Sequence, residues 1–120
     1  MRLLKIMIFA ALSIPVPILA GYKDYSPVFV GEGYAYGSVS NAYASTSVSE
    51  HIGCANNNEG FVQCSAQGSD PTRHAYCSSN KAVFQGVALS VRKSSYVYFE
   101  WDASGECTEI YVRNGSLYLP

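Results

Sequence analysis

The sequence has little charge and no block of like-charged residues. Only 14% of its residues are Asp, Glu, Lys or Arg, and the formal net charge is −1. Arg92 and Lys93 form the only pair of adjacent basic residues, whereas proteins that bind nucleic acid usually carry a clustered basic face. We therefore expect no nucleic-acid partner.

The chain also lacks an apolar segment long enough to span a membrane, which requires roughly 20 residues. Its longest apolar run, residues 6–14, is interrupted by Ser13. Arg2 and Lys5 precede this run and Ala20 follows it, an order typical of a secretory signal peptide. We predict that residues 1–20 are removed, that no membrane association follows cleavage, and that the mature chain is secreted, either extracellular or periplasmic.

The common motifs of catalysis and metal binding are missing. The sequence has no G-x-S-x-G elbow, no C-x₂₋₄-C pair and no D-x-[DN]-x-[DN]-G calcium loop. His74, close to Asp70 and Arg73, is the one candidate base with a neighbouring acid, and an ordinary surface turn accounts for these residues equally well. We expect no catalytic residue, no cofactor and no metal. A small hydrolase centred on His74 is the least favoured function.

The chain has four cysteines, an even number, and all lie beyond residue 50. A small exported domain has a thin core that disulfides usually reinforce, each by roughly 2–4 kcal/mol. Cys54 and Cys64 are equidistant from Glu59 in a turn, which favours a Cys54–Cys64 bridge and leaves Cys77 to pair with Cys107. The alternative pairs Cys64 with Cys77 and Cys54 with Cys107.

Short hydrophobic segments alternate with turn signals, as in a β-rich fold. Segments 51–54, 61–66 and 74–77 are separated by turn clusters at 56–60 and 68–71. This spacing is typical of an antiparallel meander.

The clearest hairpin lies near the C-terminus, where residues 96–101 and 106–113 flank a turn at 102–105. Pairing Trp101 with Thr108 would place Glu100 opposite Glu109, which is unfavourable. We therefore expect the register shifted by two residues, with Phe99 opposite Thr108. That register places Val97 opposite Ile110, Glu100 opposite Cys107 and Tyr96 opposite Tyr111.

Residues 78–93 contain the one helix candidate. Apolar residues recur there at helical spacing, but residues 79–91 also fit a strand, and Gly86 costs a helix roughly 1 kcal/mol. Residues 21–49, rich in Tyr, Gly and Ser, form either a flexible arm or an edge strand. The predicted fold is α+β, a small antiparallel sheet of about five strands with one helix and two disulfides, and residues 50–120 form the disulfide-linked domain.

A resemblance supports this cysteine framework. Residues 52–54 (IGC), the C-x-A at Cys64, the C-x-S at Cys77 and the run WDASGECT from Trp101 resemble a group of small exported bacterial four-cysteine proteins. The group has no known activity, so the resemblance implies export and the framework and adds no chemistry.

Tyrosine is the remaining clue to function. On the expected register, Tyr96, Tyr98 and Tyr111 share the face opposite Val97 and Phe99. An open face of this kind is suited to binding polysaccharide or another extracellular protein. The alternative is that residues 21–49 or the helix cover it as a second core. The leading function is therefore a non-catalytic surface or matrix-binding module. The second is an effector, toxin or inhibitor that presents a loop such as 56–60 on a rigid scaffold.

The predicted signal peptide and disulfides together determine the mass expected for the mature, oxidised protein. Protein recovered from the medium or periplasm should begin at Gly21, and reduction should add the mass of four hydrogens, because two disulfides open. Electrospray mass spectrometry with and without reductant checks both expectations. Full-length chain found only in the cytosol, or a mass unchanged by reduction, contradicts them.

Overall fold

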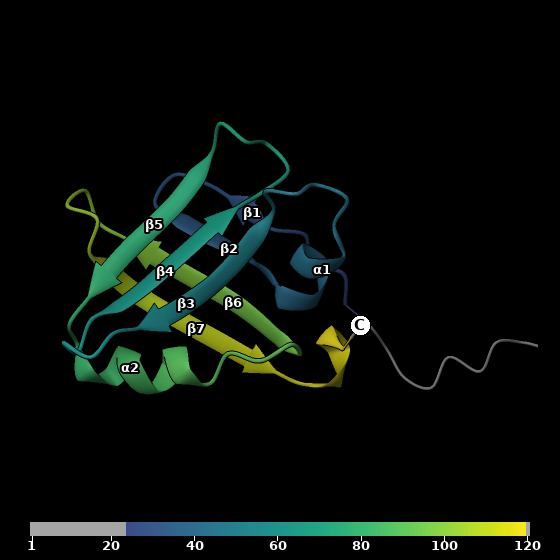
Figure 1. The fold of residues 1–120 in the computed structure, drawn as a ribbon. Helices are drawn as coiled ribbons and strands as arrows, with labels where there is room; N and C mark the ends of the chain where they lie inside the picture. Colours follow the sequence, from purple (N-terminus) through teal and green to yellow (C-terminus); the bar gives the residue numbers. More distant parts are fainter. Residues whose placement is uncertain (1–23, 120) are drawn as a thin grey trace, which may run out of the picture.

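A computed structural model describes residues 24–119, so the predicted signal peptide lies outside the described residues. The described chain forms two antiparallel sheets (Figure 1), with strand orders β1-β2-β6-β7 and β3-β4-β5. The elements in chain order are β1 (Phe29–Val30), β2 (Tyr34–Ser38), α1 (Val39–Ala44), β3 (His51–Asn56), β4 (Val62–Gln67), β5 (His74–Ser79), α2 (Ala82–Leu89), β6 (Ser95–Trp101), β7 (Cys107–Asn114) and the 3₁₀ turn η1 (Ser116–Tyr118).

The α+β class, the antiparallel strands and the two disulfides agree with the sequence analysis, but the prediction of one sheet and one helix was imprecise. The strands divide into a four-stranded and a three-stranded sheet, and the described residues contain two α-helices. The meander predicted from the turn clusters is the three-stranded sheet β3-β4-β5. No helix within residues 24–119 is long and apolar enough to cross a membrane.

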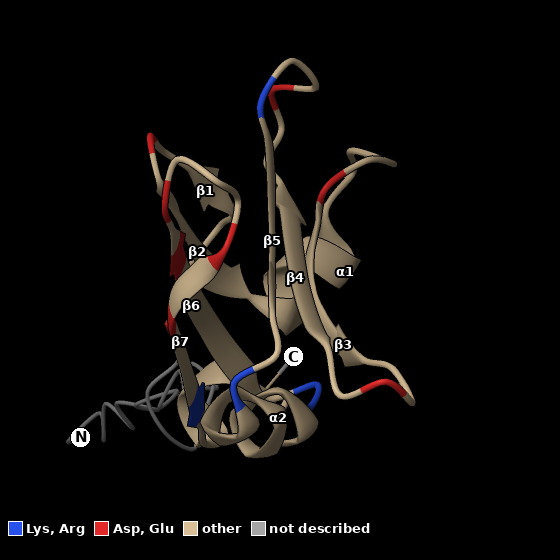
Figure 2. Ribbon diagram, turned by 90° about the vertical axis from the view of Figure 1, so that its left-hand side faces the viewer, with Lys and Arg blue, Asp and Glu red and all other residues tan. Residues whose placement is uncertain are grey.

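The core lies between the two sheets, which stand side by side in Figure 2 with α2 below the gap. α2 packs against β3 and β7, one strand from each sheet. Inward side chains of both sheets are buried, as expected for sheets that pack face to face. The largest fully buried side chains are Phe99, Val62, Val97, Cys64, Cys77, Cys107, Ser38 and Ser95.

The ambiguous segment 79–91 is helical over Ala82–Leu89. Ser79 lies at the N-terminal end, where its Oγ accepts a hydrogen bond from the Lys81 N–H at 3.1 Å. Ser90 follows the last helical residue, and its backbone N–H donates to the carbonyls of Ala88 and Val87. The helix survives the cost of Gly86 because Ala88 is buried and Phe84 and Val87 pack against the core.

The predicted register of the β6–β7 hairpin was wrong by two residues. The structure pairs Phe99 with Ile110, so Glu100 does lie opposite Glu109. A shift by two residues keeps Ile110 on the inner face in either register, so its burial does not decide between them. The charge argument is weak, because a cross-strand pair of charges contributes only about 0.2–1 kcal/mol. The repulsion between Glu100 and Glu109 is therefore too small to set the register, and it is further reduced because Glu109 is exposed.

A bulge accompanies this register. Trp101 pairs with Cys107 although Glu100 pairs with Glu109, so Thr108 is the additional residue in β7. The bulge turns Cys107 to the buried face, where its exposed fraction is 0%. The prediction that Cys107 lies opposite Glu100 on the outer face was therefore wrong.

Both disulfides join the pairs favoured by the sequence. Cys54 and Cys64 lie directly opposite each other on β3 and β4. The Cys77–Cys107 bridge joins β5 of one sheet to β7 of the other. Beside it, the Ser78 N–H donates to the Gly105 carbonyl at 3.1 Å. This corner is the covalent link between the two sheets.

Residues 21–49, expected to be a flexible arm or an edge strand, are described from residue 24 and contribute one edge strand, one interior strand and the helix α1. β1 is the edge of its sheet, and β2 lies between β1 and β6. Val28 crosses the inner side of β2, and a Cβ built on Gly37 would lie 2.8 Å from the Val28 Cα atom and 3.2 Å from its nitrogen. Glycine at position 37 permits this close approach of two backbones.

We predict that Gly37→Ala lowers the free energy of unfolding by about 1–3 kcal/mol, because the added methyl must displace the backbone of Val28. Gly53→Ala is the matched control, since a Cβ at this β3 position meets no atom within 4 Å. It should be neutral or stabilise by up to about 1 kcal/mol. Denaturant melts of the oxidised variants measure both changes, and equal stabilities would contradict the close approach.

Candidate functional site

The outer face of the four-stranded sheet carries a row of aromatic side chains that crosses all four strands. Phe29 of β1 lies opposite Tyr36 of β2, Tyr36 opposite Tyr98 of β6, and Tyr98 opposite Tyr111 of β7. Two more tyrosines flank this row on β2 and β6. We call the six residues the aromatic face: Phe29, Tyr34, Tyr36, Tyr96, Tyr98 and Tyr111.

Strand alternation places these rings outward. Ala35 on β2 and Val97 and Phe99 on β6 are completely buried between the sheets. Because successive side chains of a strand point to opposite faces, the tyrosines beside these residues point away from the core. Tyr98, rather than the predicted Tyr96, is therefore the direct partner of Tyr111.

The rings contact one another along and across the strands. The ring centroids are 5.5 Å apart for Phe29–Tyr36, 6.1 Å for Tyr36–Tyr96 and 6.4 Å for Tyr34–Tyr98. Aromatic pairs at such separations contribute about 0.5–1.5 kcal/mol beyond the burial of their area. At one end, Tyr96 contacts the ring of Tyr118 in η1, which is buried. These contacts restrict the freedom of the rings.

The aromatic face is accessible at both ends of its central row. Phe29 is 43% exposed and Tyr111 is 48% exposed, while the other four rings are half-buried. A second core over these tyrosines was the alternative weighed in the sequence analysis. Within residues 24–49, β1 and β2 belong to the sheet itself and α1 packs against β3 of the other sheet, while α2 packs against β3 and β7.

Carboxylates border the aromatic face. Glu100 lies opposite Tyr34 on one side and Glu109 on the other. The Tyr98 hydroxyl donates a hydrogen bond to the Glu100 carboxylate. This hydrogen bond, together with burial and the nearby negative charges, raises the pKa of Tyr98 to about 12. Burial also raises the pKa of Tyr96.

The acidic residues continue into the two turns at this end of the sheet. Figure 2 shows Asp and Glu side by side at the β1–β2 and β6–β7 turns and Lys and Arg around α2. Hydrogen bonds from Ser104 and Glu106 hold the pKa of the Asp102 carboxyl below its usual value. Within residues 24–119, no three His, Cys, Asp or Glu side chains are grouped so as to hold a metal ion. The acidic turns therefore give this end of the sheet a negative potential.

The structure does not bring His74 and its neighbouring acid together as a catalytic pair. The Asp70 carboxylate accepts hydrogen bonds from the Thr72 N–H at 3.0 Å and its hydroxyl at 2.7 Å. These bonds hold the pKa of Asp70 below its usual value. His74 is exposed at the start of β5. Asp70 thus organises the β4–β5 turn.

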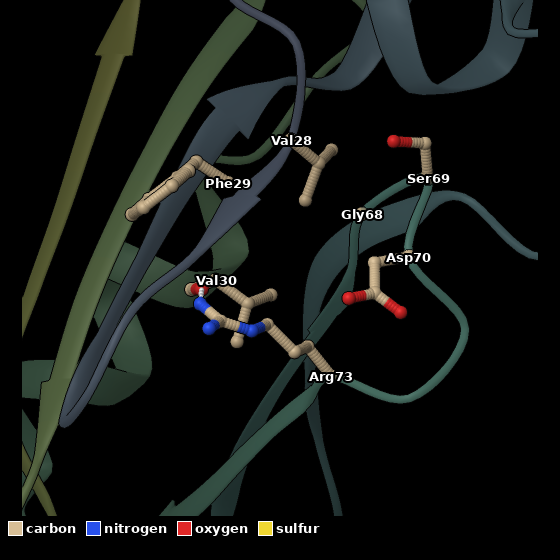
Figure 3. Close-up of a pocket in the computed structure, with 7 residues that line it drawn as sticks. All are labelled: Val28, Phe29, Val30, Gly68, Ser69, Asp70 and Arg73. Carbon is tan, nitrogen blue, oxygen red and sulfur yellow. Dashed lines mark hydrogen bonds between the residues drawn. The ribbon is translucent and has the colours of Figure 1, made fainter.

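A shallow hollow of about 210 Å³ lies between residues 28–30 and the β4–β5 turn (Figure 3). Arg73 reaches across it, and its guanidinium donates to the Val30 carbonyl at 3.3 Å. The contact ties the turn to the edge strand β1, so the hollow is best explained by packing of the two sheets.

Loop 56–60, the candidate for presentation to a target, is closed by its own hydrogen bonds. The Asn57 side-chain oxygen accepts from the N–H groups of Glu59 at 3.0 Å and Phe61 at 2.9 Å. The loop is exposed and carries no cluster of charge or aromatic residues.

Comparisons with protein-family models, with curated proteins and with solved structures find no significant match to the chain.

The raised pKa of Tyr98 makes the hydrogen bond to Glu100 testable. In the unfolded chain Tyr98 loses its proton near pH 10, whereas the folded chain retains it to about pH 12. Stability from this bond is therefore complete below pH 10 and falls as the pH rises towards 12. Ultraviolet titration should show a tyrosine that titrates at about pH 12, which Tyr98→Phe removes and Glu100→Gln shifts towards pH 10. Tyr43→Phe, at an exposed position on α1, should leave it unchanged.

Proposed function

We propose that this chain is a secreted, non-catalytic binding module whose aromatic face binds a polysaccharide or a protein of an extracellular surface or matrix. The observation that carries the proposal is the aromatic row across all four strands, which is exposed at both ends. A ligand laid across the strands would meet a continuous line of rings. This arrangement supports binding to an extended ligand.

Tyrosine is well suited to such a surface. Its ring provides a large apolar area with few rotatable bonds, and its hydroxyl donates and accepts hydrogen bonds. In the aromatic face the rings already contact one another, so little side-chain freedom remains to be lost on binding. Sugar rings, which combine apolar faces with hydroxyl edges, match both properties.

The carboxylates beside the aromatic face restrict the ligand further. Glu100 and Glu109 lie in the row next to Tyr98 and Tyr111. A polyanion would meet like charge there, at a cost that complementary interfaces avoid. The proposed ligand is therefore neutral or positively charged at this end.

Retention on insoluble ligands tests the proposal. The mature, oxidised protein should be retained on at least one of cellulose, chitin, peptidoglycan or immobilised matrix protein. Phe29→Ala and Tyr111→Ala should each weaken retention about tenfold, because about 1.4 kcal/mol corresponds to tenfold and a stacked aromatic contact contributes a similar amount. Since both side chains are more than 40% exposed, each truncation should lower stability by about 1 kcal/mol or less.

Two exposed tyrosines outside the aromatic face provide matched controls. Tyr43 of α1 is 93% exposed and Tyr76 of β5, on the other sheet, is 54% exposed. Tyr43→Ala and Tyr76→Ala should leave retention unchanged. The proposal is contradicted if the wild-type protein binds none of these ligands, or if the control variants weaken retention as much as Phe29→Ala and Tyr111→Ala.

A further inference from the structure

β7 forms one edge of the four-stranded sheet and pairs along its length with β6, while an isolated bridge between Ser78 of β5 and Glu106 lies next to its Cys107 end. It is eight residues long, from Cys107 to Asn114, and its outward side chains Glu109, Tyr111 and Arg113 are exposed. A long edge strand offers unpaired backbone groups to another chain unless it is protected. This edge carries no Pro and no Lys, and its one bulge lies at the Cys107 end.

The hydrogen bonds of the sheet show which β7 groups face the open edge. The Gly115 N–H donates to the Ser94 carbonyl at 3.2 Å, and the Trp101 N–H donates away from β7, to Gly33 at 3.1 Å. Because N–H and C=O of a residue point to the same side and the sides alternate along a strand, the backbone groups of Glu109, Tyr111 and Arg113 bond β6. Those of Ile110, Val112 and Asn114, beyond the bulge at Thr108, point outward.

This edge is complementary to itself. We propose that two copies of the chain pair through β7, antiparallel about a two-fold axis at Tyr111, to form one continuous eight-stranded sheet. In this register, Ile110 of one copy exchanges backbone hydrogen bonds with Val112 of the other, and both residues have outward-pointing groups. Glu109 of each copy then lies opposite Arg113 of the other copy, and these two opposite-charge pairs favour this register.

The neighbouring registers lack that match. A two-fold axis at Ile110 places Glu109 opposite Tyr111, and an axis at Val112 places Glu109 opposite Gly115. Each also satisfies the backbone, because the same outward-pointing groups pair. The charges therefore select the axis at Tyr111, and the pairing is isologous, as closed dimers require.

The dimer would join the two aromatic faces. Tyr111 meets Tyr111 of the second copy at a non-hydrogen-bonded position, where Cα atoms of antiparallel strands are about 4.5 Å apart. The row of four aromatic residues becomes a row of eight on one side of the sheet. α2 packs against β7 (Figure 1), and its Val83 and Leu89 are 69% and 64% exposed. These apolar side chains are available to add contact beside the paired strands.

Charge exchange tests the register. Sedimentation velocity of the mature, oxidised protein should show a reversible monomer–dimer equilibrium that weakens with added salt. Glu109→Arg and Arg113→Glu should each raise the dissociation constant about tenfold or more, because two attractive pairs become repulsive. The double variant E109R/R113E should restore dimerisation. Glu59→Arg, at an exposed position in the β3–β4 turn, should have no effect.

The Glu109→Arg variant should not fail to fold, because it places a cation opposite Glu100 of its own sheet. A second measurement depends on geometry alone. Tyr111→Cys should form a disulfide-linked dimer in air, whereas Thr108→Cys, which faces Asn114 of the second copy, should not. The proposal is overturned by a monomer at all concentrations, by a dimer that persists in E109R, by failure of the double variant to dimerise, or by equal cross-linking at both positions.

Discussion

Burial of one inner row of side chains fixes the four-stranded sheet on which the rest of the molecule depends. Val30, Ala35, Phe99 and Ile110 lie opposite one another on successive strands, and each is at most 7% exposed. Because side chains alternate between faces, a slip of one residue in any strand would exchange buried and exposed sets. The inner row thereby aligns the next row, in which Phe29, Tyr36, Tyr98 and Tyr111 face outward.

The link between the two sheets depends on the same register. With Phe99 opposite Ile110, regular pairing would place Thr108 opposite Trp101 and send Cys107 to the outer face. The bulge at Thr108 returns Cys107 to the inner face, where it reaches Cys77 of the other sheet. Closing a loop of this sequence separation, 30 residues, contributes about 3–4 kcal/mol in the chain-entropy account. That is a large share of the stability of a small domain.

Local signals predicted the turns and both disulfides, but they did not predict the register of the β6–β7 hairpin. The turn clusters at 56–60 and 68–71 predicted the meander, and the symmetry of Cys54 and Cys64 about their turn predicted a bridge across one hairpin. The β6–β7 register was mispredicted because its deciding partner is the second sheet, which no hairpin argument includes. β2 was underestimated because its inward residues, Ala35 and Gly37, are small. Glycine at position 37 is required by the close crossing of Val28, a contact that the sequence does not reveal.

Some residues of the aromatic face stabilise the sheet by packing against one another, and others are exposed to solvent. The half-buried rings of Tyr34, Tyr36, Tyr96 and Tyr98 contact neighbouring rings, so cross-strand packing is sufficient reason for them. The ends of the central row differ. Phe29 and Tyr111 leave 43% and 48% of their surface in water, area that stabilises only when a second molecule covers it. Tyr111 also lies on the open edge strand, so a second copy and a ligand would meet at one residue. Pairing through β7 would then lengthen the ligand surface without any new contact within the monomer.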